Sequence, residues 1–365
     1  MSGPKWVQGA PRGPAGPPSV PAVPGAQGQT QLSLGIGLTN ACNLKCAHCY
    51  RPRGAAQHLG LDDVVRCLDR FDVASVTLGT GENILNPALP AVLDELERRG
   101  VRTSLTSNGL SLGQLDEARL VRLHDVEVSF DFATRAELDA FRGRGAFDLA
   151  LRAVERCVAL GLKVTILAVL MRINWDRLAS VAKLAARLGA SFRVNVFQPV
   201  HETGHMPSWE QLWGGFRRLF GEAEVVTCTE PVVAALLPAR AGSAPRPCGC
   251  GRTSLRLLPG GELLPCVYWP RPAAMLADLD DVALFQTKEF KAARSVPDVC
   301  RSCPLFDRCG GGCPARRALT TGLDAPDPFC PRRHGTAATP LHASFGTGPD
   351  LLHAANVCTT IVRAG

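Results

Sequence analysis

The chain has 365 residues, of which 46% are hydrophobic and 20% are charged, and its formal net charge is +7. This length and apolar content are enough for a sizeable core and for more than one domain. The positive charge is mild and lacks a dense Lys/Arg block, and no segment resembles a transmembrane span or a signal peptide, so neither nucleic acid nor a membrane is an expected partner. We therefore predict a cytoplasmic protein, in which 15 cysteines favour metal binding or catalysis over disulfides.

Residues 1–31 are rich in Pro, Gly and Ala without apolar periodicity, and they are predicted to form a disordered leader. Six strand-like segments follow, at 32–39, 73–79, 101–109, 126–131, 162–171 and 191–200. Amphipathic helices are expected between them at 61–71, 86–100, 115–123, 147–161 and 175–189. In the second of these helices, Asn86 is the predicted N-cap, Pro87 the first helical position and Gly100 the stop signal.

Continuous apolar strands that alternate with amphipathic helices predict an α/β fold with a parallel sheet covered by helices. A closed or partly closed barrel suits this pattern better than an open nucleotide-binding sheet, because no Gly-rich dinucleotide turn follows the first strand. The barrel is expected over 32–221, followed by a connector over 222–247. Dense Cys, Gly and Pro then predict a small, metal-stapled domain over 248–331, and residues 332–365 are expected to be a tail.

The loop after the first strand contains three cysteines, Cys42, Cys46 and Cys49, within eight residues. A structural zinc site is closed by four protein ligands, and an iron–sulfur cube also usually takes four thiolates. Three thiolates would leave one iron open to a substrate or a cosubstrate. The loop also follows the carboxyl end of its strand, which is where α/β barrels place their chemistry.

The C-x3-C-x2-C spacing followed by Tyr50 resembles the signature of the radical SAM superfamily. The resemblance implies a partial (β/α)6 TIM-like barrel in which the three thiolates hold a [4Fe-4S] cluster and S-adenosylmethionine chelates the open iron. It also implies that one electron cleaves S-adenosylmethionine to a 5′-deoxyadenosyl radical, which abstracts a hydrogen atom from the substrate. An electron donor such as flavodoxin or ferredoxin is therefore an expected partner.

Residues at the ends of the later strands match further positions of the family. The turn GTGEN at 79–83 corresponds to the Gly-Gly-Glu-Pro-like turn that contacts the methionyl amino group, although Thr80 replaces one Gly and Asn83 replaces the Pro. The resemblance places ribose and carboxylate contacts after the third, fourth and fifth strands, and adenine contacts near the sixth. The implied cofactor contacts are Tyr50, Gly79, Gly81, Glu82, Ser107, Asn108, Ser129, Asp131, Arg172, Asn195 and Val196.

A second set of cysteines has the spacing C-x10-G-x4-C, then C-x2-C-x5-C-x3-C, then a final Cys, and it resembles the SPASM extension of radical SAM enzymes. The extension implies two auxiliary [4Fe-4S] clusters. By this resemblance the first is held by Cys248, Cys250, Cys266 and Cys313, and the second by Cys300, Cys303, Cys309 and Cys330. Because only Gly249 separates Cys248 from Cys250, the fourth ligand of the first cluster stays open. The spacing alone also fits a four-cysteine zinc site.

The resemblance implies an iron–sulfur-dependent oxidoreductase of natural-product biosynthesis, in which the substrate radical loses an electron to the auxiliary clusters. The expected substrate is a ribosomal peptide that is crosslinked or oxidised on a side chain. One alternative is a small molecule, such as a cyclitol or aminoglycoside intermediate, that is dehydrogenated or epimerised. An alternative of another class is a non-catalytic zinc-binding scaffold. Sulfatase-maturing relatives tend to place an acidic residue after the cysteine that matches Cys266, whereas this chain has Val267.

The stretch HETGH at 201–205 matches a zinc-protease motif, which requires a helix. Pro199, Gly204 and Pro207 make that helix improbable, and a solvated loop near the substrate is expected instead.

Four other cysteines and two aromatic residues complete the set of candidates. Cys67 and Cys157 fall on apolar helix faces and are predicted to be core thiols. Cys228 and Cys358 belong to neither cysteine pattern, and either could donate a hydrogen atom in an epimerase-type reaction. Tyr268 and Trp269 follow Cys266 directly and are expected to pack over a cluster.

Overall fold

The computed structural model describes residues 31–238, 248–336, 339–353 and 358–364. The predicted leader at 1–31 lies outside the described residues, apart from residue 31. Within them, none of the helices has the length and the apolar run needed to cross a bilayer.

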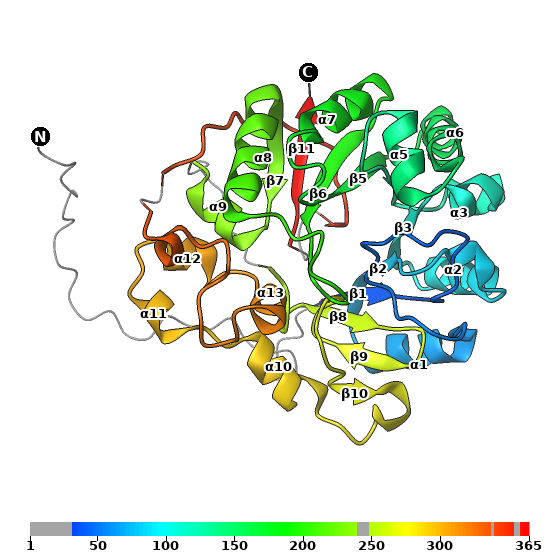
Figure 1. The fold of residues 1–365 in the computed structure, drawn as a ribbon. Coiled ribbons are helices and arrows are strands. Elements are labelled where there is room, and N and C mark those ends of the chain that lie inside the picture. Colours follow the sequence, from blue (N-terminus) through cyan, green and yellow to red (C-terminus); the bar gives the residue numbers. More distant parts are fainter. Residues whose placement is uncertain (1–30, 239–247, 337–338, 354–357, 365) are drawn as a thin grey trace, which may run out of the picture.

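One mixed sheet of eleven strands forms the centre of the described molecule, in the order β10-β9-β8-β1-β2-β3-β4-β5-β6-β11-β7 (Figure 1). Its strands are β1 (Leu32–Ile36), β2 (Val73–Leu78), β3 (Arg102–Ser107), β4 (Asp125–Ser129), β5 (Val164–Leu170), β6 (Ser191–Val196), β7 (Ala223–Cys228), β8 (Ser254–Leu257), β9 (Glu262–Leu264), β10 (Ala274–Met275) and β11 (Thr360–Ala364). The six strands β1–β6 pair in parallel and in chain order, which confirms the predicted parallel sheet.

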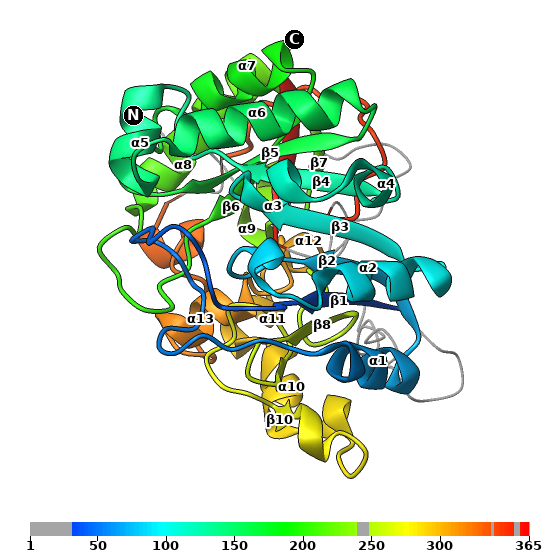
Figure 2. The same cartoon turned by 90° about the vertical axis from the view of Figure 1, so that its right-hand side faces the viewer.

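The helices that connect the parallel strands pack on the outer face of the sheet and cover its apolar side chains (Figure 2). The described α-helices are α1 (Leu61–Arg70), α2 (Leu89–Arg98), α3 (Leu110–Gln114), α4 (Glu117–Leu120), α5 (Arg135–Arg142), α6 (Ala146–Ala159), α7 (Leu178–Arg187), α8 (Trp209–Glu222), α9 (Pro231–Leu236), α10 (Lys288–Ala293), α11 (Asp298–Arg301), α12 (Phe306–Cys309) and α13 (Pro314–Leu319). The single helix expected at 115–123 was wrong, because the chain forms two short helices, α3 and α4, around an extended Leu115.

The start of α2 also differs from the prediction. Ala88 is the N-cap, and Pro90 rather than Pro87 lies in the first turn. Asn86 still accepts a hydrogen bond, from the Ala88 N–H at 2.8 Å, but its amide also donates to the carbonyls of Leu38 and Leu59. The side chain therefore ties the start of the helix to the chain around the first cysteine loop. Gly100 stops the helix as expected, with φ +67°.

Segments far along the chain complete the sheet at both edges of the parallel strands. From the cysteine-rich region, β8 pairs in parallel with β1. From the predicted connector and tail come β7 and β11, and β11 lies antiparallel between β6 and β7. The sheet therefore runs across the expected domain boundaries, which stay a prediction.

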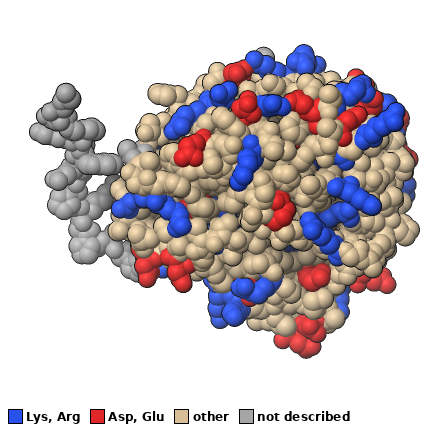
Figure 3. Space-filling model, in the orientation of Figure 1, with Lys and Arg blue, Asp and Glu red and all other residues tan. Residues whose placement is uncertain are grey.

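The face of the molecule drawn in Figure 3 carries charges of both signs in close mixture. Several form ion pairs across neighbouring helices; for example, Arg119 of α4 contacts both Asp94 and Asp116 at 2.7 Å. Such exposed pairs contribute little to stability.

Candidate functional site

A cavity of about 240 Å³ lies within the curve of the parallel strands and reaches their carboxyl ends. Its wall includes the three cysteines of the first loop, Cys42, Cys46 and Cys49, which we call the loop cysteines. At its other end it is lined by a second set, the inner thiol group, which consists of Cys248, Cys250, Cys266, Cys313 and Cys358. One space therefore connects two groups of cysteines that are more than 190 residues apart in the sequence.

The loop cysteines are half-buried and have polar neighbours. Cys42 Sγ accepts hydrogen bonds from the Leu44 N–H at 3.4 Å and from the Asn108 amide at 3.6 Å. Arg142 Nη1 approaches Cys46 Sγ at 4.0 Å. Burial raises the pKa of the Cys46 thiol, and the Arg142 guanidinium opposes this rise. The loop is thus suited to hold thiolates only where positive charge compensates them.

The GTGEN turn after β2 rests directly on the backbone of the cysteine loop. The Glu82 N–H donates to the Ala41 carbonyl at 2.8 Å. Gly81 has φ +64°, and a Cβ at this position would lie 2.4 Å from the Thr39 carbonyl oxygen. A glycine is therefore required there. Thr80, where the family has a second glycine, also has a positive φ of 80°, a strained conformation for a β-branched residue.

Glu82 is buried beside the loop cysteines, and protein donors surround its carboxylate. It accepts hydrogen bonds from the Ser107 hydroxyl, from the Asn108 N–H at 3.0 Å and from the Ser111 N–H at 2.7 Å. These bonds join the end of β2 to the end of β3. Asn108 continues the connection to the cysteine loop, because its amide donates to Asn43 at 2.8 Å.

Most of the predicted cofactor contacts line the cavity: Tyr50, Gly79, Gly81, Glu82, Ser107, Asn108, Ser129, Asn195 and Val196. Their arrangement follows from the parallel sheet, since the carboxyl ends of its strands meet along one edge. Tyr50 also packs edge-on against Tyr268 of the cysteine-rich region, with ring centroids 5.2 Å apart.

Two predicted contacts do not lie in the cavity wall. Arg172 is exposed, and its guanidinium donates to the Met206 carbonyl at 3.3 Å, because the chain has already turned outward beyond the end of β5. Asp131 is buried behind the wall, where its carboxylate binds Arg142 Nη2 at 2.7 Å and lies 3.6 Å from His48 Nε2. In this structure Asp131 thus holds Arg142 beside Cys46, rather than facing the cavity itself.

Sequence reasoning missed a set of buried charged groups in the cavity wall. Glu127 of β4 forms an ion pair with Arg193 of β6, and His353 Nδ1 lies 3.1 Å from the Glu127 carboxylate. Burial lowers the pKa of His353 to about 3, so the imidazole is neutral. The sequence did contain a signal for this ion pair, because Glu127 and Arg193 are charged residues within strands whose other residues are mostly buried.

Arg256 of β8 is a further buried cation that sequence reasoning missed. Its guanidinium donates to the Gly79 carbonyl at 2.9 Å and to the Thr80 hydroxyl. It therefore connects the cysteine-rich region to the GTGEN turn, and it places a positive charge in the wall between the two groups of cysteines.

The predicted auxiliary cysteines occupy two separate places. The inner thiol group lines the cavity, and within it the thiols of Cys250 and Cys266 are close neighbours. The outer cysteine set, which comprises Cys300, Cys303, Cys309 and Cys330, is not part of the cavity wall. Burial raises the pKa of Cys300, and the nearby charges of Cys330 and Cys303 raise it further. The structure therefore places these cysteines in two separate groups, and Cys358 lies with the first. That either group holds a cluster stays a prediction.

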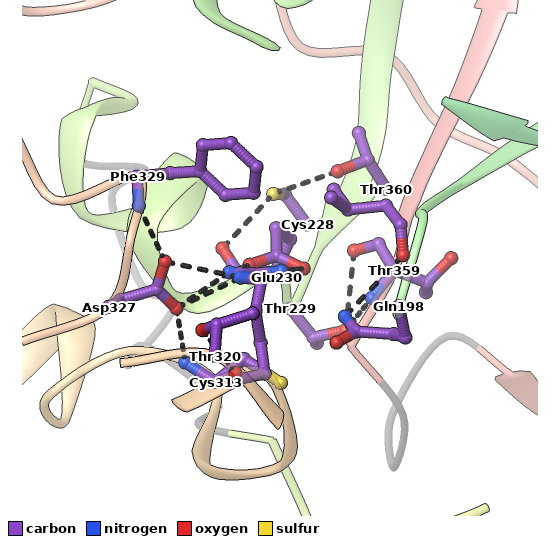
Figure 4. Close-up of polar contacts among 12 residues, drawn as sticks. Gln198, Cys228, Thr229, Glu230, Cys313, Thr320, Asp327, Phe329, Thr359 and Thr360 are labelled. Atoms are coloured by element: carbon purple, nitrogen blue, oxygen red, sulfur yellow. Dashed lines mark hydrogen bonds and ion pairs between the residues drawn. The ribbon is translucent and has the colours of Figure 1, made fainter. Parts of the chain in front are cut away.

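A buried network of charges holds the segment around Cys313 (Figure 4). Arg316 of α13 contacts Glu230 at 2.6 Å and Asp327 at 2.8 Å, and all three side chains are at most 1% exposed. The Asp327 carboxylate also accepts the Cys313 N–H at 2.9 Å. The network thus fixes the direction of Cys313.

The remaining candidates have local roles. The 201–205 stretch contains no helix, which confirms the expected loop, and His205 packs against Phe141 and Phe197. Cys67 and Cys157 are fully buried, as predicted. Cys228 Sγ lies 3.2 Å from the Thr360 hydroxyl.

Trp269 is buried in the small apolar cluster that contains Cys250 and Cys313, with Tyr268 packed against it. That the two aromatic residues pack over a cluster stays a prediction.

Within the described residues, no three His, Cys, Asp or Glu side chains are arranged so that they could hold one ion together. The loop cysteines instead present three thiols to one cavity, with Arg142 beside Cys46, and this donor set fits a cluster that carries one ligand from outside the protein.

Comparison with known proteins places this site in context. The model of the radical SAM superfamily matches residues 36–185. The mycofactocin maturase MftC of Mycobacterium ulcerans is 30% identical over 329 residues, which cover 82% of this chain and 88% of that protein. The PqqA peptide cyclase of Streptomyces rochei is 26% identical over 322 residues, which cover 81% of this chain and 88% of that protein.

Solved structures share the fold. Streptococcus suis SuiB bound to S-adenosylmethionine superposes with a TM-score of 0.61 at 18% identity, over 80% of this chain and 75% of SuiB. SuiB bound to its precursor peptide SuiA superposes with a TM-score of 0.59 at 16% identity, over 81% of this chain and 75% of SuiB.

Proposed function

The chain belongs to the radical SAM superfamily, and from this premise we propose that it is a maturase that oxidises a side chain of a ribosomal peptide. It is an enzyme that depends on a [4Fe-4S] cluster and S-adenosylmethionine, and the loop cysteines are the residues that would hold the cluster. When bound, the pair supplies a 5′-deoxyadenosyl radical, which removes a hydrogen atom from the substrate.

The observation that carries the proposal is the single cavity between the loop cysteines and the inner thiol group. A substrate in this cavity would touch both groups. We propose that the inner thiol group and the outer cysteine set each hold an auxiliary [4Fe-4S] cluster and that the first accepts the electron of the substrate radical. In such an oxidation the substrate would lose one hydrogen atom to the deoxyadenosyl group, one electron to the cluster held by the inner thiol group and one proton to a base, so that atoms and electrons balance.

The residues of the cavity wall have their own tasks in this proposal. Glu82 holds the ends of β2 and β3 in register with the cysteine loop, and Asn108 holds Asn43 and Cys42. Arg142, held by Asp131, compensates the charge at Cys46. Tyr50 and Tyr268 give the wall an aromatic surface on which a peptide side chain can pack.

A peptide substrate is favoured by the relatives. MftC is a mycofactocin maturase, the second relative is named a PqqA peptide cyclase, and SuiB has been solved with a precursor peptide. We extend this chemistry to the present chain as a proposal. A cytoplasmic electron donor such as flavodoxin or ferredoxin completes it.

Co-expression with short peptides encoded beside this gene tests the proposal. We expect mass spectrometry to show one peptide that loses hydrogen relative to the unmodified form, and we expect 5′-deoxyadenosine to form in an anaerobic assay with dithionite. Cys300→Ala should keep 5′-deoxyadenosine formation and stop the change in the peptide. Unchanged masses of all peptides, together with turnover of a small molecule, would contradict the peptide substrate.

A further inference from the structure

Cys358 belongs to neither cysteine pattern of the sequence, but the fold places it in the inner thiol group. It lines the cavity and packs against the small cluster that contains Cys250 and Cys313. Its thiol is a near neighbour of the thiols of both Cys248 and Cys313, which belong to the same cluster. Cys228 of β7 lies opposite Thr360 of β11, which is two residues after Cys358 in the chain. The Cys228 thiol has the Thr360 hydroxyl as its partner instead. The environment of Cys358 is therefore that of a ligand group rather than that of a core thiol.

The backbone at Cys358 is firmly held by the next residue, Thr359 (Figure 4). The Thr359 hydroxyl donates to Asn195 Oδ1 at 2.8 Å and accepts from Arg193 Nε at 2.9 Å. Its carbonyl accepts the N–H groups of Thr229 at 2.8 Å and Glu230 at 3.1 Å. These contacts fix the start of β11 to the end of β6 and to the segment after β7. The pairing of β11 in the sheet consequently fixes the position of Cys358.

Glu230 connects the contacts that hold the chain at Cys358 to the contacts that hold it at Cys313. Its N–H binds the Thr359 carbonyl, and its carboxylate binds Arg316 at 2.6 Å. Arg316 in turn binds Asp327, which accepts the Cys313 N–H. A continuous chain of buried contacts, partly visible in Figure 4, thus sets the positions of these two thiols relative to each other.

The inner thiol group has one cysteine more than a cube can use. A [4Fe-4S] cube offers four irons, whereas five thiols line this end of the cavity. Cys250, Cys266, Cys313 and Cys358 come from four separate segments, so they can approach a cube from four sides. Cys248 lies on the same segment as Cys250, only two residues before it, so it adds no fifth direction of approach.

We propose that Cys358 is the fourth ligand of the first auxiliary cluster, together with Cys250, Cys266 and Cys313, and that Cys248 is the thiol left unbound. The proposal rests on the proposed function, because it requires an auxiliary cluster at this place. On assembly, the Cys358 thiol loses its proton and forms an Fe–S bond. The C-terminal strand thereby becomes part of the metal site.

The test uses the full chain with Cys42, Cys46 and Cys49 all replaced by alanine, so that only auxiliary clusters remain. After anaerobic reconstitution we expect about eight irons per chain, four for each cube. Adding Cys358→Ala should lower this to about four and remove one set of signals from the electron paramagnetic resonance spectrum of the reduced protein. Adding Cys248→Ala or the matched control Cys228→Ala should leave about eight irons and an unchanged spectrum.

Cys358→Ser is the control for loss of iron through unfolding rather than through loss of a ligand. Serine preserves the packing and offers an oxygen ligand, so the cluster should remain with shifted spectral positions and a changed reduction potential. About eight irons and an unaltered spectrum in Cys358→Ala would overturn the proposal. Loss of iron from Cys248→Ala would overturn the part that leaves Cys248 unbound. A parent protein that binds no iron at all would instead refute the auxiliary clusters of the proposed function.

Discussion

The loop cysteines and the inner thiol group line the same cavity, but the chain assembles them in different ways. The loop cysteines lie within eight residues of one another on a single loop after β1. The inner thiol group combines segments between residues 248 and 358, and a buried network around Arg316 holds one of its members. The first group depends on local spacing, whereas the second depends on tertiary structure. Changes in the two regions should therefore have different consequences.

The largest effect is expected at the loop cysteines. Replacing Cys42, Cys46 and Cys49 together by alanine should abolish formation of 5′-deoxyadenosine, because no other thiol among the described residues lies on this loop. The fold should persist, since the half-buried loop contributes little to the core. Circular dichroism and an anaerobic activity assay measure the two properties. If the triple variant still cleaved S-adenosylmethionine, the loop cysteines would have no role that the inner thiol group lacks.

A second prediction concerns Arg316, whose loss should affect stability rather than cleavage chemistry. Arg316→Met leaves Glu230 and Asp327 buried without their cation, which should lower the free energy of unfolding by about 3–5 kcal/mol. Arg119→Met is a matched control, because Arg119 also bridges two carboxylates but lies at the surface. Its cost should be below about 1 kcal/mol. Urea denaturation under anaerobic conditions gives both values, and equal costs would contradict the assigned role of the network.

A smaller effect on stability is expected from His353. This prediction tests whether the charged residues of the cavity wall are as well shielded from solvent as the buried network around Arg316. Burial lowers the pKa of His353 to about 3, so the unfolded chain binds a proton near its ordinary pKa while the folded chain does not. Its contribution to stability is thus fully present above the ordinary histidine pKa and is lost as the pH falls toward the lowered value.

Between about pH 6 and about pH 5, the wild-type protein should therefore lose about 1 kcal/mol more stability than His353→Gln. The exposed His201→Gln should follow the wild-type curve. Urea denaturation at the two pH values provides the measurement. Parallel curves for wild type and His353→Gln would mean that the imidazole takes up its proton in the folded state.

The parts of the molecule that depend on local pattern could be predicted from the sequence. The strands β1–β6 and the cysteine loop were found because apolar runs and cysteine spacing are properties of neighbouring residues. Arg142 and Cys358 could not be found in this way, because they reach the cavity only through packing of α5 and insertion of β11. Arg172 was placed in the site by its position after β5, but the direction in which the chain leaves a strand is not encoded in that position.

The insertion of β11 has a consequence for how the protein is made. This strand follows all the others along the chain, yet it lies between β6 and β7 and pairs with both. A nascent chain that still lacks residues 360–364 leaves the facing edges of β6 and β7 without their shared neighbour, so the sheet can be finished only after these residues have left the ribosome. Delivery of metal by the cell's assembly machinery to the thiol beside this strand would accordingly have to follow the synthesis of residues 360–364.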